Sequence, residues 1–287
     1  AHAAAAKQKT KFLDTFLKPV WEIISKGKID LLELFSGSQR MSAAASAAGN
    51  RVGQPIDLRT GFDLGLPEGQ SKTWEIIESQ EPECVWMAIV CTPWTSAQNA
   101  NDPAQVAAAR QKAMPMIRFC LEVAEYQMSK GRYFVIENPA SSQLWTIKEL
   151  RALLSEAGVS SDTAHLCMHG LQDPESLKYY NKSLRLAHNF PLGVLDPIFL
   201  KCDHSHAHDV VQGRYRNGLP KTLYTQVYPL RFCRCFSKLL SHFLFSLRSK
   251  SPESLYSSED FEADYLDNGQ DRKSTRLNSS HTVISYA

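Results

Sequence analysis

The chain has 287 residues, of which 43% are hydrophobic and 22% charged, and its formal net charge is +2. This composition fits one large core or two small ones, and the near-neutral balance excludes nucleic-acid binding by bulk charge alone. Seven irregularly spaced cysteines without a signal peptide exclude a disulfide framework and favour a reducing intracellular compartment, nucleus or cytoplasm. No apolar run approaches the ~20 residues of a membrane helix, so we expect no membrane partner.

The first half of the chain alternates strand and helix patterns. Residues 1–19 begin without methionine and are expected to be the N-terminal end of a fragment. Residues 29–35 form an apolar run that ends at Ser-Gly-Ser, which is typical of a buried parallel strand entering a turn. An Ala-rich segment predicts a helix, residues 51–57 predict a second strand, and residues 71–80 have helical spacing.

The alternation continues with a third strand at 84–90, which runs into Cys91. A long helix is predicted to follow as far as about residue 130, with Asp102 as its N-cap and Pro103 in its first turn. Residues 132–139 predict a fourth strand that ends on polar residues. Further on, the pattern predicts helices at 146–157 and 229–248 and strands at 163–170 and 183–190.

Strand and helix in alternation predict a doubly wound α/β domain with a mostly parallel sheet over residues 20–248. Residues 249–270 are acidic and Ser-rich, which is typical of a disordered tail. The segment DRKSTRLNSSH in 271–287 equals the translation of a common sequencing adapter, so we interpret these residues as an artefact.

Polar residues gather where the predicted strands end, and ligands bind at the carboxyl ends of strands in such sheets. A tight turn at Gly37 would let a ligand approach backbone N–H groups at the next helix. Asp57, about twenty residues later, is a candidate for ribose hydroxyls, and Asp63 for the adenine side of a nucleotide. Both carboxylates could equally be solvated turn residues.

Cys91 has two interpretations, a buried core thiol or a nucleophile at a strand end. Glu137 closes the neighbouring predicted strand, so a carboxyl group and a thiol would face one pocket. A cysteine with a nearby proton donor is a recognisable catalytic pair, which favours the nucleophile.

The set resembles the cytosine-C5 methyltransferases, including the shortened domains of phage genomes and mobile-element polyproteins. The matching segments are Glu33-Leu34-Phe35-Ser36-Gly37, then Cys91-Thr92-Pro93-Trp94-Thr95, then Glu137-Asn138-Pro139, in the family's order over roughly 30–140. The resemblance implies a Rossmann-like, S-adenosylmethionine-dependent methyltransferase fold. It also implies a nucleic-acid substrate, DNA rather than RNA.

The resemblance further implies roles for residues. Cys91 would attack C6 of cytosine, Glu137 would bind N3 and the amino group, and the methyl group would pass to C5. Asn138 would accompany Glu137, and Arg185 would stand where the family has an arginine near the base. The implied cofactor contacts are Phe35, Ser36, Gly37 and Pro93, together with Asp57 and Asp63.

Departures from the family keep a second hypothesis open, an inactive methyltransferase-like domain of a mobile-element or phage-derived polyprotein. Gln39 and Arg40 stand where further glycines are usual, and Ile89 and Val90 replace prolines. The chain leaves too little room for a target-recognition domain before the last helix. Methylation of a base amino group fits less well, because those enzymes carry an Asn/Asp-Pro-Pro-aromatic loop.

A Cys/His cluster, KCDHSHAHD, lies between the last predicted strand and the last helix. On an extended segment the alternate spacing would place four metal-ligating side chains on one face: Cys202, His204, His206 and His208. These are good zinc ligands, although structural zinc sites commonly have wider spacing. The alternative is a polar loop whose histidines contact phosphate or solvent.

Overall fold

The computed structural model describes residues 23–249. The predicted tails at 1–19, 249–270 and 271–287 lie outside the described residues, except for Ser249. Residues Pro19–Ser241 form one compact unit, of which the structure describes residues 23–241. The last turns of helix α7, from His242, belong to a second unit and are described only as part of that helix.

The core of the unit is a five-stranded sheet in the order β1-β2-β3-β6-β4. β1, β2 and β3 pair in parallel, and β6 runs antiparallel to both of its neighbours. This confirms the predicted α/β class with a mostly parallel, Rossmann-like sheet. The strands are β1 (Leu31–Leu34), β2 (Cys84–Ala88), β3 (Tyr133–Pro139), β4 (Ser160–His165) and β6 (Ser183–His188).

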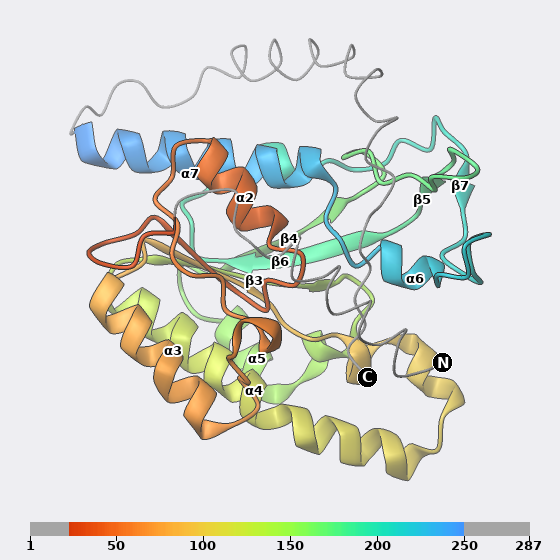
Figure 1. The fold of residues 1–287 in the computed structure, drawn as a ribbon, viewed down its shortest axis with the longest axis horizontal. Coiled ribbons are helices and arrows are strands. Elements are labelled where there is room, and N and C mark those ends of the chain that lie inside the picture. The colour runs from red at the N-terminus through yellow and green to blue at the C-terminus, as the bar shows by residue number, and fades with distance from the viewer. Residues whose placement is uncertain (1–22, 250–287) are drawn as a thin grey trace. The chain divides into compact units, whose positions relative to one another are not determined.

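Helices cover both faces of the sheet, as Figure 1 shows. One face carries α2 (Arg40–Ala47) and α7 (Leu230–Ser249). The other carries α3 (Pro67–Gln80), α4 (Pro103–Ser129) and α5 (Lys148–Leu154). All five helices were predicted, and the cap of α4 is as expected, because the Asp102 carboxylate accepts the Ala104 N–H at 3.0 Å.

The two helical layers bury the sheet between them. On the α7 side the ring of Trp86, fully buried in β2, meets Phe232 and Phe236 with centroids 6.0 and 4.6 Å away. On the α4 side alternate strand residues, such as Val85 and Phe134, join the apolar face of α4 in one core cluster. Strand residues are therefore apolar on both faces, as a doubly covered sheet requires.

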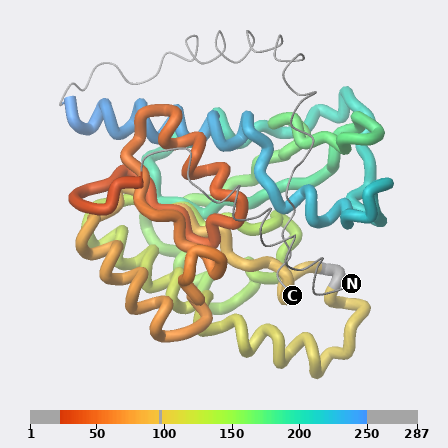
Figure 2. The backbone as a smooth tube through the Cα atoms, in the orientation of Figure 1, coloured from red at the N-terminus to blue at the C-terminus, as the bar shows by residue number. Residues whose placement is uncertain are grey.

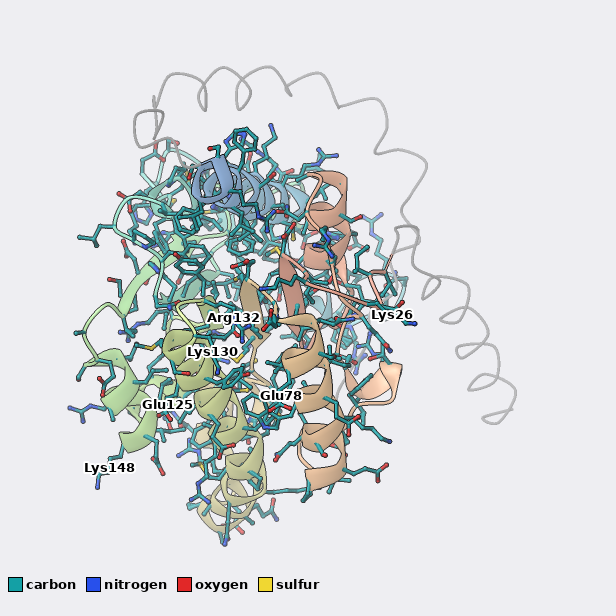
Figure 3. All side chains as sticks on the ribbon, turned by 90° about the vertical axis from the view of Figure 1, so that its left-hand side faces the viewer. Lys26, Glu78, Glu125, Lys130, Arg132 and Lys148 are labelled. Atoms are coloured by element: carbon teal, nitrogen blue, oxygen red, sulfur yellow. The ribbon has the colours of Figure 1, made fainter. Side chains whose placement is uncertain are left out.

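Outside this core the helical layer carries charges of both signs. Figure 3 labels exposed side chains there, among them Glu78 of α3, Glu125 of α4 and Lys148 of α5. Acidic and basic groups alternate on this surface, so it is a solvated face rather than a basic track for nucleic acid. Within residues 23–249 no helix is both long enough and apolar enough to cross a membrane.

The predicted strand at 51–57 is wrong as a strand. It runs beside β1 but makes only two isolated parallel bridges, Leu31 with Val52 and Leu34 with Ile56. Pro55 lacks the N–H that a continuous ladder needs. Gly53 is pressed so closely on the core that an added Cβ would lie 2.5 Å from Ile29 Cδ1.

Residues 166–229 contain, apart from β6 of the main sheet, a smaller substructure that precedes α7 in the chain. It contains a two-stranded parallel sheet of β5 (Tyr179–Tyr180) and β7 (His208–Asp209), and the short helix α6 (Lys221–Tyr224). Figure 2 shows this part, green to blue, beside the main sheet. The strand predicted at 163–170 is shifted, because β4 starts at Ser160 and ends at His165.

Candidate active site

The carboxyl ends of β1, β2 and β3 bring the predicted site residues to one edge of the sheet. The turn Phe35–Gly37 follows β1, Cys91 follows β2, and Glu137 and Asn138 belong to the last residues of β3. The strands are adjacent and parallel, so these ends are neighbours in space. The predicted convergence at one edge therefore holds for the backbone.

The turn after β1 contains three residues with left-handed backbone conformations. Phe35, Gly37 and Gln39 have φ values of 57°, 48° and 57°. Only glycine adopts this left-handed region without strain, so the surrounding contacts must compensate at Phe35 and Gln39. The Ser36 hydroxyl is buried here without a hydrogen-bond partner, which leaves a polar group at the turn for a ligand.

Asp57 and Arg59 close this turn from the side. The Gly37 N–H donates to Asp57 Oδ2 at 2.9 Å, and the Arg59 guanidinium donates to the Gly37 carbonyl at 2.9 Å. Asp57 also accepts the Arg59 N–H at 3.1 Å and caps the 3-10 turn η1 (Leu58–Thr60). The polar groups of Gly37 are thus occupied by protein, although Asp57 stands where the sequence predicts a cofactor ligand.

Asp63 is exposed at the surface, whereas Pro93 lies in the loop that carries Cys91. The exposed Asp63 carboxylate accepts the Gly65 N–H at 2.9 Å, which is an ordinary turn contact. Pro93 lies in the 3-10 turn η2 (Thr92–Trp94) directly after Cys91, and its carbonyl accepts from Arg110 at 3.1 Å. Arg110 also lies over the buried Trp94 ring at 5.1 Å, so α4 anchors the loop that carries the thiol.

Glu33, in the middle of β1, is a second buried carboxyl group on the α7 side of this edge. Its Oε2 accepts the Ser42 N–H at 2.9 Å and the Ser42 hydroxyl. Burial raises its pKa to about 7, the Ser42 hydrogen bonds oppose the shift, and the Asp57 charge adds to it. Sequence reasoning quoted Glu33 in a motif but assigned it no role.

Cys91 and Glu137 are linked through a lysine and a tyrosine that the sequence did not single out. The Tyr228 hydroxyl, just before α7, donates to Glu137 Oε2. The Lys182 ammonium, held by the Thr225 carbonyl, interacts electrostatically with both the thiol and the carboxylate. The edge therefore carries a nucleophile, a proton-binding group and a cation.

Burial dominates the protonation of this cluster. It raises the pKa of the Cys91 thiol, which Lys182 lowers and Glu137 raises further. It also raises the pKa of Glu137, against the Tyr228 hydrogen bond and the Lys182 charge. A carboxyl group with a raised pKa keeps its proton at higher pH and can donate it, while the ammonium favours the thiolate.

Asn138 and Arg185 lie on the other face of the sheet from Glu137. They are register partners on β3 and β6, whereas Glu137 pairs with Leu186. The Asn138 amide donates to the Ile89 carbonyl at 2.6 Å and so holds the strand that leads to Cys91. Arg185 bonds the Ser161 hydroxyl at 2.7 Å and lies 4.9 Å over the Trp145 ring. The structure does not bring Arg185 to Glu137.

The predicted Cys/His set is corrected at one ligand. Cys202, His206 and His208 converge, but their fourth neighbour is Cys167, from the turn after β4, and not His204. His204 has φ 60°, so the segment is not extended and its ring leaves the shared face. Cys167 lies 35 residues before Cys202, beyond the reach of any local spacing pattern.

Comparisons with known proteins add a distant likeness in fold. No protein-family model matches the chain, and a search of curated proteins finds no match. Among solved structures, it is similar to the S. pombe Dnmt2 methyltransferase, with a TM-score of 0.38 and 18% identity over 62% of this chain and 57% of that one. The chain spans little more than half the length of that protein.

Proposed function

We propose that this chain is an S-adenosylmethionine-dependent methyltransferase that acts on C5 of cytosine in nucleic acid, DNA in the first place, through the Cys91 thiolate. One observation carries the proposal, the meeting of Cys91 and Glu137 with Lys182 at the carboxyl ends of adjacent strands. A structural core has no need of a half-buried thiol and ammonium group beside a buried carboxyl group, because burying a charged group costs desolvation. All seven cysteines are free, in keeping with a reducing compartment.

The residues of the β1 turn fit the cofactor in part. The buried Ser36 hydroxyl has no hydrogen-bond partner, and Asp57 lies beside it in contact with the Gly37 N–H. Phe35, Ser36, Gly37 and Asp57 would hold the nucleoside part, with Pro93 closing the pocket from the thiol loop and Asp63 at its outer rim. When bound, S-adenosylmethionine supplies the methyl group that C5 receives.

In the proposed reaction, the Cys91 thiol and the Glu137 carboxyl group act on the cytosine ring. The Cys91 thiolate forms a bond to C6, and the electron pair displaced from the C5–C6 bond makes C5 nucleophilic. Burial raises the pKa of Glu137, which favours its role as the group that donates a proton to N3 and offsets the charge that develops on the ring. A solvent base then takes the C5 proton, the C5–H electron pair re-forms the C5–C6 bond as the S–C6 bond breaks, and N3 returns its proton to Glu137, which restores the base and the thiolate. A base inside a duplex must flip out of its stack before the thiol can reach C6.

A second candidate is a catalytically inactive domain of a mobile-element or phage-derived polyprotein. The observation in its favour is the occupied turn, since Asp57 and Arg59 take up both backbone groups of Gly37. Arg40, where the family has small residues, donates to the Tyr228 carbonyl at 2.8 Å and so serves the packing of α7.

Binding and trapping separate the two candidates. We expect calorimetry to show saturable S-adenosylmethionine binding that Asp57→Ala weakens strongly and Asp63→Ala, a matched carboxylate at the rim, weakens less. Single-stranded DNA containing 5-fluorocytosine should then form a covalent adduct with the wild type and not with Cys91→Ser. Binding without an adduct identifies the inactive domain, and no binding at millimolar ligand overturns the methyltransferase.

A further inference from the structure

Four soft donor atoms converge outside the candidate active site. They are the sulfur atoms of Cys167 and Cys202 and a ring nitrogen each of His206 and His208, all within 4.8 Å of one another. Cys167 is buried and the other three are half-buried. Two thiols and two imidazoles are the donor set of structural zinc sites.

The separations match the edges of a zinc tetrahedron. Zinc–sulfur bonds of about 2.3 Å and zinc–nitrogen bonds of about 2.05 Å give S···N edges of about 3.6 Å and an N···N edge of about 3.4 Å. Cys202 Sγ lies 3.6 Å from Nε2 of both His206 and His208, and the two Nε2 atoms are 3.1 Å apart. The two S···N edges therefore have the length that a shared ion requires, and the N···N edge is about 0.3 Å shorter.

The chain builds this arrangement with a reversal in the middle of the segment. Asp203 Oδ1 accepts the Ser205 N–H at 3.0 Å, and His204 takes a left-handed conformation. The turn directs the His204 N–H onto Cys202 Sγ at 3.3 Å and returns the chain toward the sulfur at His206. An N–H donated to a cysteine sulfur stabilises the thiolate that a metal binds.

Neighbouring elements orient the remaining ligands. The Tyr179 ring lies 4.3 Å from the His206 ring, and Tyr179 is the register partner of His208 in the β5–β7 sheet. The Cys202 N–H donates to His165 Nδ1 at 3.1 Å, which ties the segment to the end of β4 close to Cys167. Supported ligands of this kind are pre-positioned for a metal.

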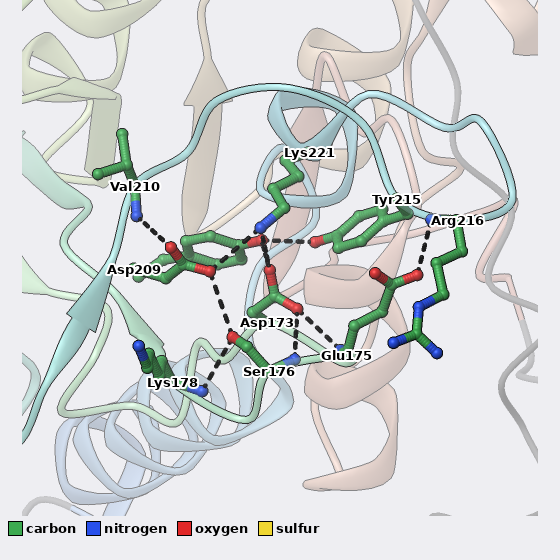
Figure 4. Close-up of polar contacts among 10 residues, drawn as sticks. Asp173, Glu175, Ser176, Lys178, Asp209, Val210, Tyr215, Arg216 and Lys221 are labelled. Atoms are coloured by element: carbon green, nitrogen blue, oxygen red, sulfur yellow. Dashed lines mark hydrogen bonds and ion pairs between the residues drawn. The ribbon is translucent and has the colours of Figure 1, made fainter.

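The next residue along β7 belongs to a buried ion-pair network, which Figure 4 shows. The Lys221 ammonium lies 2.6 Å from Asp173 and 3.1 Å from Asp209. Asp173 also accepts from the Tyr180 hydroxyl at 2.5 Å, and Tyr180 bonds the Tyr215 hydroxyl at 2.8 Å. These polar contacts stabilise the β5–β7 sheet at Asp209. They do not involve the four residues of the Cys/His cluster, which would need an interaction of their own.

We propose that Cys167, Cys202, His206 and His208 bind one zinc ion in a closed tetrahedral site that stabilises the substructure 166–229. Four protein ligands leave no open position for a substrate, so the site is structural and independent of the methyl-transfer chemistry. The ion joins the turn after β4 to β7 and so cross-links two segments that lie far apart in the chain.

The test begins with the wild-type chain purified under reducing conditions without chelator. We expect one zinc per chain by elemental analysis, and after exchange to cobalt the charge-transfer and ligand-field absorption of tetrahedral thiolate coordination. A chelator should lower the melting temperature. Absence of the cobalt bands, or a two-hydrogen mass loss that shows a Cys167–Cys202 disulfide under reducing conditions, would overturn the site.

Variants assign the ligands. His206→Ala should weaken cobalt binding by at least about 100-fold, and Cys202→Ser should weaken it and remove charge-transfer intensity. His204→Ala is the matched control, because it removes the same side chain from the same segment and should leave affinity and spectrum unchanged. Equal losses in His204→Ala and His206→Ala would contradict the assignment. The wild-type cobalt spectrum carries the test if a variant fails to fold.

Discussion

The strand-edge cluster and the Cys/His cluster both contain a cysteine that sequence patterns singled out, and they differ in how the fold treats it. Cys91 interacts with Glu137 and Lys182, and Tyr228 donates to Glu137, so that three further parts of the chain contribute to this cluster. Cys202 meets two histidines within six residues, through a turn, and only Cys167 is distant. The first cluster combines a thiol with a carboxyl group and an ammonium group, and the second combines thiols and imidazoles whose donor atoms lie within 4.8 Å of one another.

This difference teaches that the clusters serve different ends. Groups whose pKa values are shifted by burial and by one another's charges are suited to moving protons and electron pairs. Donor atoms at tetrahedral distances, supported by hydrogen bonds, are suited to holding an ion. Substitutions at the strand edge should therefore change chemistry more than folding, and substitutions at the Cys/His cluster should change folding more than chemistry.

The largest expected effect is that of Cys91→Ser. Replacing the thiol by a poorer nucleophile should lower methyl transfer to DNA at least about 10³-fold, with S-adenosylmethionine affinity and melting temperature unchanged. Cys202→Ser is the comparison variant, and it should keep the rate per folded molecule while lowering the melting temperature. Equal loss of rate in both variants would break the distinction between the clusters.

The second effect concerns stability against pH at Glu33. Burial raises its pKa to about 7 in the fold from an ordinary 4.5, so the folded state binds the proton more tightly. Tighter proton binding by Glu33 stabilises the folded state fully at pH values below the pKa of Glu33 in the unfolded chain. This contribution is lost as the pH rises through the pKa of Glu33 in the folded protein. From about pH 4 to about pH 8, the unfolding free energy should fall by about 3 kcal/mol more in wild type than in Glu33→Gln.

Chemical denaturation at several pH values measures this difference. The matched control is Glu78→Gln, on the exposed surface of α3, which should follow the wild-type curve. A Glu33→Gln curve that runs parallel to wild type would show that Glu33 does not hold its proton in the fold.

The third prediction compares two cations, Lys182 directly before β6 and Arg185 within it. Lys182→Met removes the charge that lowers the pKa of Cys91, so kcat should fall about 100-fold and the rise of rate with pH should move to higher pH. Arg185→Met removes a side chain on the other face and should cost less than about tenfold. A larger loss at Arg185 would restore it as the arginine near the base.

The smallest effect is expected in the polar network beside the Cys/His cluster. Burial disfavours the charged form of Asp173, but hydrogen bonds from Lys221, Tyr180 and backbone N–H groups hold its pKa well below the usual range. Asp173→Asn should lower the melting temperature by roughly 3–6 °C near neutral pH. A carboxyl group whose pKa is lowered in the fold stabilises the folded state at pH values above its pKa in the unfolded chain. The difference in melting temperature between wild type and Asp173→Asn should therefore vanish in acid. Methyl transfer should be unchanged.

Much of the fold followed from local patterns. Apolar runs of four to seven residues ending at polar turns located β1, β2, β3 and β6, and the Asp-Pro cap located the start of α4. The segment 51–57 misled because its apolar residues alternate correctly, while Pro55 and the crowding at Gly53 prevent a ladder. Periodicity reports which residues are buried but not whether backbone hydrogen bonds are complete.

The sequence by itself determined the α/β class and the edge of the sheet where Cys91 and Glu137 meet, because parallel strands must end together and their ends are marked by polar residues. Only the tertiary structure decided which side chains share a face there. Lys182 and Tyr228 join the thiol and the carboxyl, and Arg185 faces away, since a shift of one residue in register reverses a side chain. The tertiary structure also decided that Cys167, and not His204, is the fourth member of the Cys/His cluster. His204 has a left-handed backbone conformation, so the segment turns where the spacing pattern assumes an extended chain.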